Sequence, residues 1–168
     1  MDNNSIIDKK TFDVCINAED HPDVFICDKL LAESISELNK KGYSTYASCS
    51  GHYRIEFYEY FNEDIKNLEE FKNNDRIIIK NINKSSFDYW EEVDFTETYI
   101  LFSKKYIFNT LPINFYIDND ESRTCIRCKI NYYDSSNKRK TVKEIVREIE
   151  DNCNNIRKWV EELPYINK

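Results

Sequence analysis

Apolar residues recur at helical spacing in a stretch near the start of the chain. Leu31, Ile35 and Leu38 lie at i, i+4 and i+7, so their side chains share one face of a helix. Asp28 is a suitable N-cap residue, and a glycine follows the basic last turn. The pattern predicts an amphipathic helix over residues 28–41.

A longer apolar seam predicts a second helix near the end of the chain. Thr141 and Glu144 match a capping box at its start, and Pro164 ends it. A sheet or a partner must cover the seam, whose members are three or four residues apart: Val142, Ile145, Ile149, Cys153, Ile156, Val160 and Leu163.

Alternating and β-branched runs predict strands in the rest of the chain. We expect them around residues 12–16 and 24–27, and at 43–48, 54–61, 76–82, 98–102, 113–117 and 123–133, with a short helix inserted at 62–73. The polar residues 1–10 are expected to be loose. The predicted fold is α+β, a mostly antiparallel sheet with two main helices packed on one face, in a single domain spanning residues 1–168.

Composition narrows the classes of function. The formal charge of -7 argues against loose, charge-driven binding to nucleic acid. No apolar run reaches the ~20 residues that a membrane span needs, and the first residues lack the apolar core of a signal peptide. We therefore expect a cytoplasmic protein with no membrane partner, and no motif indicates a particular cofactor.

The six cysteines are predicted to be free thiols, because their spacing shows no disulfide framework. Cys15 and Cys27 lack the close pairing that a zinc site needs. Cys125 and Cys128 have the spacing of a zinc knuckle or redox pair, but on a continuous strand their side chains point to opposite faces. We therefore predict no metal site.

The best candidate site is the turn Ser48-Cys49-Ser50-Gly51-His52, which follows a predicted strand. The two serines offer hydroxyls, the glycine lets successive N–H groups converge, and the histidine exchanges a proton near neutral pH. The leading hypothesis is binding of a small anionic ligand, phosphate-bearing or nucleotide-like. Nucleophilic or metal chemistry by the cysteine and histidine, and a purely structural turn, stay open.

An acidic, aromatic segment over residues 87–97 predicts a different function. Tyr89, Trp90 and Phe95 belong to the residue types that dominate interface energies, and the carboxylates of Asp88, Glu91, Glu92 and Asp94 lie beside them in sequence. A protein that binds a basic partner or imitates a phosphate backbone, as a phage-encoded inhibitor would, is the alternative hypothesis. The competing interpretation places Trp90 in the core.

The helix followed by Thr45-Tyr46-Ala47-Ser48-Cys49-Ser50-Gly51 resembles the start of the wybutosine-synthesis methyltransferase family. That resemblance implies methylation of a tricyclic guanosine derivative in tRNA with S-adenosylmethionine, and it makes residues 48–51 the ligand loop. His52 stands where the family has arginine.

A second resemblance is to short uncharacterised proteins of low-GC Gram-positive bacteria and their phages. It rests on residues 41–45, the Cys-Ser-Gly-His turn at 49–52, residues 99–102 and Leu111-Pro112. This resemblance covers most of the chain and implies no known activity.

Overall fold

The computed structural model describes residues 4–15, 23–51, 79–83, 86–90, 97–120, 122–131, 133–138, 140 and 142–166. Its helices are the short 3-10 helix η1 (Lys29–Leu31), α1 (Ala32–Lys40) and α4 (Val142–Glu162). Its strands are β1 (Asn4–Asp8), β2 (Val14–Cys15), β3 (Val24–Asp28), β4 (Thr45–Cys49), β5 (Ile79–Asn83), β6 (Ser86–Trp90), β7 (Thr98–Phe102), β8 (Tyr116–Asn119) and β9 (Thr124–Cys128).

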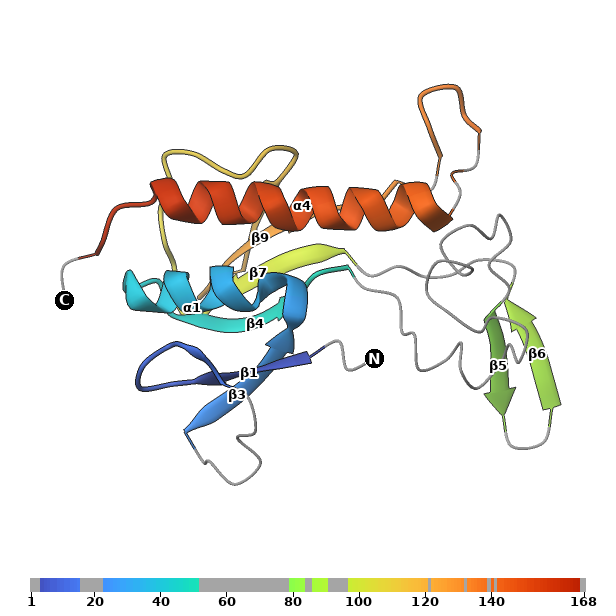
Figure 1. Ribbon diagram of the computed structural model, residues 1–168. Helices are drawn as coiled ribbons and strands as arrows, with labels where there is room; N and C mark the ends of the chain where they lie inside the picture. The colour runs from blue at the N-terminus through green and yellow to red at the C-terminus, as the bar shows by residue number, and fades with distance from the viewer. Residues whose placement is uncertain are drawn as a thin grey trace.

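The described strands form three antiparallel sheets. Their orders are β2-β1-β3, β4-β7-β9-β8 and β5-β6. Helices α1 and α4 contact each other and lie along the four-stranded sheet, with α4 crossing over β7 and β9 (Figure 1). The predicted α+β class is confirmed. The strand predicted at 54–61 and the helix predicted at 62–73 lie outside the described residues.

The main core lies between the two helices and one face of the four-stranded sheet. Ile100 on β7 pairs with Ile126 on β9, and both side chains are fully buried. The apolar seam of α4 covers them: Ile145, Ile149, Cys153, Ile156, Val160 and Leu163 are all buried, as its spacing predicted. Each large aliphatic side chain buried in this way contributes roughly 1.5 to 3 kcal/mol.

The expectation that residues 1–10 are loose is wrong for residues 4–8. These residues form β1, which pairs with both β2 and β3. Ile7 is fully buried and packs with Cys27 and Ala32 in a second, smaller core. Pairing with β3 satisfies the backbone hydrogen-bonding groups of β1. Burial of Ile7 anchors this strand, although the residues before and after it in the sequence are polar.

Asp28 stands at the predicted N-cap position, but the capping hydrogen bond expected of it is not made. Its Oδ2 atom instead accepts a hydrogen bond from the backbone N–H of Ser50. This bond joins the end of β3 to the predicted functional turn.

Candidate functional site

The first two residues of the predicted turn, Ser48 and Cys49, are the last two of β4, and the chain leaves the strand at Ser50. Cys49 and Ser50 are buried, with exposed fractions of 8% and 1%, and Gly51 is buried beside them. Gly51 has a φ of 85°, a left-handed conformation that favours glycine. The chain therefore turns at the residue that can do so with least strain.

The N–H groups of this turn have partners within the protein. The N–H of Ser50 donates to Asp28 Oδ2 at 2.6 Å, and that of Gly51 donates to Cys49 Sγ at 3.4 Å. Asp28 is 7% exposed, so a carboxylate occupies the position in which an anion would meet the Ser50 N–H. This geometry favours a structural role for Ser50 and Gly51. His52 lies outside the described residues, so ligand binding by the whole turn stays a prediction.

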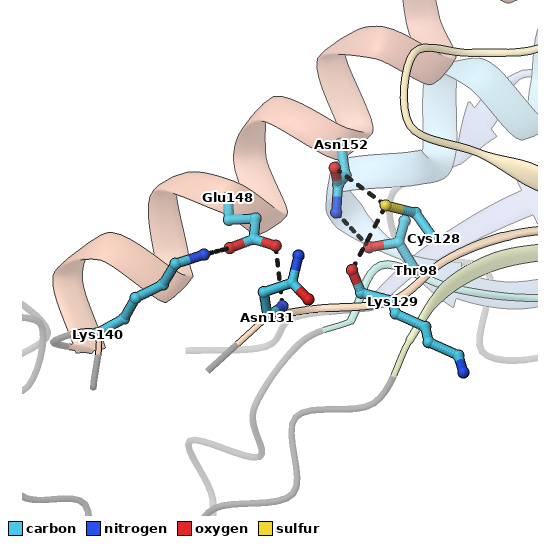
Figure 2. A network of polar contacts seen from close by, with 7 residues as sticks. All are labelled: Thr98, Cys128, Lys129, Asn131, Lys140, Glu148 and Asn152. Carbon is cyan, nitrogen blue, oxygen red and sulfur yellow. Dashed lines mark hydrogen bonds and ion pairs between the residues drawn. The ribbon is translucent and has the colours of Figure 1, made fainter. Parts of the chain in front are cut away.

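A chain of hydrogen bonds leads from the turn to helix α4. The hydroxyl of Thr98 donates to the carbonyl oxygen of Ser50 at 2.9 Å. Asn152 on α4 donates to Thr98 Oγ1 at 3.3 Å and accepts from the thiol of Cys128 at 3.6 Å (Figure 2). Thr98, Cys128 and Asn152 are all buried. A buried polar network with these partners rigidifies the site.

A second set of contacts joins the segment after β9 to α4. The carboxylate of Glu148 binds the ammonium of Lys140 and accepts the N–H of Asn131 at 3.0 Å. Figure 2 shows Lys140 and Asn131 approaching Glu148 while the side chain of Lys129 extends away from the helix. The Lys140 and Glu148 side chains are 19% and 21% exposed, so the pair is partly shielded from solvent.

Residues from both sets of contacts line a cavity of about 670 Å³ beside α4. Four asparagines, three carboxylates and three cationic side chains line it, together with one tyrosine and one cysteine. They are Asn114, Tyr116, Cys128, Lys129, Asn131, Lys140, Glu144, Arg147, Glu148, Asp151, Asn152 and Asn155. Most of the lining residues have polar or charged side chains, the formal charges of these side chains balance, and several of their hydrogen-bonding groups are partly buried and held in place.

The arrangement of Cys125 and Cys128 agrees with their predicted placement on opposite faces. Cys128 belongs to the core beneath α4 and bonds to Asn152, whereas the Cys125 sulfur accepts from Arg127 Nη2 at 3.6 Å. Burial raises the pKa of both thiols, so they stay protonated at neutral pH. The described residues contain no group of three or more side chains suited to a metal ion.

The proposed interaction residues are only partly placed. Tyr89 and Trp90 lie on β6, whose backbone pairs with β5 at Lys80 and Ile79. Their side chains, and Phe95, lie outside the described residues. The interaction surface stays a prediction.

Sequence reasoning did not identify Thr98, Glu148 or Asn152 as site residues. A signal was present for Asn152, because it lies three residues after Ile149 and four before Ile156. That spacing places its amide on the buried face of α4. A polar residue on such a face requires a partner in the fold.

No protein-family model, curated protein or solved structure matches this chain. The two resemblances drawn from the sequence therefore stay predictions. Among the described residues, no helix is long and apolar enough to cross a membrane.

Proposed function

We propose that this protein binds a small nucleotide-like molecule in the polar cavity beside α4. The observation that carries the proposal is the lining of asparagine amides around a buried, hydrogen-bonded floor. The volume of about 670 Å³ lies in the usual range for small-molecule sites. This keeps the ligand class predicted from the sequence and moves its position from the turn to the cavity.

The lining suits the parts of a nucleoside. An asparagine amide offers both donors and an acceptor, which match the edge of a heterocyclic base. Glu148 and Asp151 supply carboxylates, the group that accepts hydrogen bonds from ribose hydroxyls in dinucleotide-binding sites. Arg147 is a suitable partner for a phosphate. The balance of charges favours a nucleoside or a monophosphate over a polyphosphate.

The floor of the cavity is preorganised. Asn152 is held by Thr98 and Cys128, and Glu148 is held by Lys140 and the N–H of Asn131. Binding therefore orders few additional side chains, which lowers its entropic cost. In this proposal the Ser48-to-Gly51 turn supports the floor through Thr98 and does not contact the ligand.

Calorimetric titration of the full chain with the four common ribonucleosides and their 5′-monophosphates tests the proposal. We expect saturable binding of at least one of them, weakened at least tenfold, or about 1.4 kcal/mol, by Asn155→Ala. Asn154→Ala is the matched control, because Asn154 is exposed on the same helix and does not line the cavity. No heat with any of these ligands at millimolar concentration, or equal losses in both variants, would contradict the proposal.

The same titration separates this proposal from two of the earlier hypotheses, the methyltransferase resemblance and ligand binding at the turn. S-adenosylmethionine contains adenosine, so binding of the cofactor that is abolished by Asn155→Ala would support the methyltransferase resemblance at this cavity. Binding lost in Gly51→Ala but kept in Asn155→Ala would return the ligand to the predicted turn. A folded Gly51→Ala protein, checked by circular dichroism, is needed for that comparison because Gly51 has a positive φ.

A further inference from the structure

The edges of two sheets line one cavity of about 440 Å³, which shares no lining residue with the polar cavity beside α4. Strand β3 ends the sheet β2-β1-β3, and β4 ends the sheet β4-β7-β9-β8. The two strands contact each other and both line the cavity, but within the described part of the chain they do not pair with each other. Each therefore has one edge on which no described strand satisfies its backbone groups.

The hydrogen bonds of β4 show which of its backbone groups lie on this open edge. The N–H of Thr45 donates to Asn39 Oδ1 at 3.3 Å, and that of Ser50 donates to Asp28 Oδ2 at 2.6 Å. Both N–H groups therefore point away from β7. Backbone groups alternate between the two edges of an antiparallel strand, so those of Ser48, two residues before Ser50, point the same way. At this edge the Ser48 backbone has no hydrogen bond to another described residue.

The same reasoning places Ile26 on the open edge of β3. The N–H of Lys9 donates to the carbonyl oxygen of Asp23 at 2.6 Å, so the backbone of Asp23 faces the strand β1 and its continuation. Three residues later the alternation has reversed, and the backbone of Ile26 faces away from β1. Ile26 lines the cavity, is 67% exposed, and makes no backbone hydrogen bond at this edge to a described residue.

We propose that an extended peptide binds between β3 and β4 by strand addition. Its backbone pairs with Ile26 on one side and with Ser48 on the other, so the two sheets and the peptide form one continuous sheet. A strand residue occupies roughly 160 Å³, from a rise of about 3.3 Å, a strand spacing of about 4.8 Å and a layer of about 10 Å. The cavity therefore accommodates about three residues of such a peptide.

The lining of the cavity defines the side chains of this partner. Phe12, Phe25 and Ile35 supply apolar surface, and Lys9 is the one charged residue of the lining. Lys9 forms no ion pair with any residue that the structure describes, whereas the adjacent Lys10 binds Asp23. The partner is therefore an extended peptide with apolar residues at alternate positions and a carboxylate at one end.

Thermophoresis of the labelled full chain with amidated hexapeptides tests the proposal. The peptides alternate valine, leucine or phenylalanine with threonine and end in aspartate. We expect saturable binding of at least one, and at least tenfold weaker binding after N-methylation of its central amides, which removes backbone donors but keeps every side chain. No saturable change at millimolar peptide, or equal binding of the methylated form, overturns the proposal.

Ser48→Pro tests the open edge of β4 in the protein. Proline removes the N–H that points away from β7, so the pairing of β4 with β7 is kept. We expect at least tenfold weaker peptide binding with little change in melting temperature. Ser48→Ala is the matched control, because it removes only the hydroxyl, and it should bind like the original protein. Equal affinity of the two folded variants overturns the proposal.

Lys9→Gln tests the charge of the partner. We expect this change to weaken binding of the aspartate peptide several-fold and to leave binding of the same peptide with asparagine unchanged. Lys10→Gln is the control, because Lys10 does not line the cavity. Equal effects of the two changes overturn the carboxylate assignment. Dimers that form without peptide and that Ser48→Pro dissociates assign the two edges to a second copy and overturn the peptide proposal.

Discussion

The two ends of α4 differ in the kind of group that they bury. The C-terminal half buries Ile156, Trp159, Val160 and Leu163. Trp159 packs against Phe108 with ring centroids 5.0 Å apart, in an aromatic cluster that also contains Tyr43, Phe102 and Tyr106. The face of this end of the helix that meets the aromatic cluster is therefore apolar.

The C-terminal end of α4 is also closed by a buried cation. Lys41, 5% exposed, donates from Nζ to the carbonyl oxygens of Val160, Glu161 and Leu163 at 2.8 to 2.9 Å. The last carbonyls of a helix have no partner within the helix and carry its negative dipole end. One side chain from the end of α1 therefore donates to three carbonyls at the end of α4, of which that of Val160 also accepts a longer bond from the N–H of Leu163 at 3.3 Å.

The N-terminal half of α4 also buries aliphatic side chains, namely Ile145, Val146 and Ile149, but it adds polar groups next to the large cavity. Asn152 and Glu148 project from this half toward Thr98, Cys128 and Asn131 (Figure 2). The comparison shows how one helix serves two purposes. The apolar end supplies stability, and the polar end keeps a cavity whose groups are held by hydrogen bonds instead of being filled by side chains.

The largest expected effect is that of Trp159→Ala at the apolar end. Trp159 is 4% exposed and donates from Nε1 to the carbonyl oxygen of Thr110 at 2.9 Å. We expect the free energy of unfolding to fall by about 3 to 5 kcal/mol in urea denaturation. A loss below about 1 kcal/mol would show that the aromatic cluster is not the main source of stability at this end.

Lys41→Met tests the buried cap. Methionine keeps much of the side-chain length but removes the ammonium that donates to three carbonyl oxygens, so we expect the free energy of unfolding to fall by about 2 to 3 kcal/mol. Lys40→Met is the matched control, because Lys40 forms a partly exposed ion pair with Asp13, whose loss should reduce stability much less. Equal losses of stability in the two variants would show that the buried cap stabilises the protein no more than the exposed ion pair does.

Asn152→Ala tests the polar end. It removes the donor to Thr98 and the acceptor for Cys128, and we expect it to cost about 1 to 2 kcal/mol in the same denaturation experiment. Asn154→Ala, at an exposed position on the same helix, should change stability by less than about 0.5 kcal/mol. A loss as large as that of Trp159→Ala would remove the contrast between the two ends.

Cys153 lies near the middle of α4. Ionisation of its thiol is expected to have the smallest effect on stability near neutral pH. Burial, followed by the nearby Asp28 and Cys49, raises its pKa to about 12, from 9.0 for a free thiol. Between these values the unfolded thiol loses its proton while the folded one keeps it, so stability falls as pH rises from 9 to 12. The measurement is urea denaturation at pH 8, 10 and 11, with Cys153→Ala showing a weaker decline.

Thiol labelling of the native protein near neutral pH checks by a second route that Cys153 is buried. Cys15 is half-buried and the other five cysteines are buried. We expect rapid modification of Cys15 alone. Modification of Cys153 at a similar rate would contradict its placement in the core.

Local sequence patterns predicted which helices and strands form better than they predicted the residues at which these elements begin and end. The seam of α4 and the strand at 98–102 agree with the structure, because helix and strand periods are visible in neighbouring residues. The strand predicted at 123–133 spans only Thr124–Cys128, and the one predicted at 113–117 is Tyr116–Asn119. Where a strand ends depends on its pairing partner, which local periodicity does not contain.

The sequence by itself also determined that residue 51 is suited to a sharp turn, since glycine adopts positive φ at little cost. Only the tertiary structure decided what surrounds that turn. Asp28 lies 22 residues from Ser50 in sequence, and Thr98 lies 48 residues from it. Asn152 lies a further 54 residues beyond Thr98. These groups meet because β4 pairs with β7 and α4 packs across β7, and such long-range pairing leaves no periodic signal in the residues that it joins.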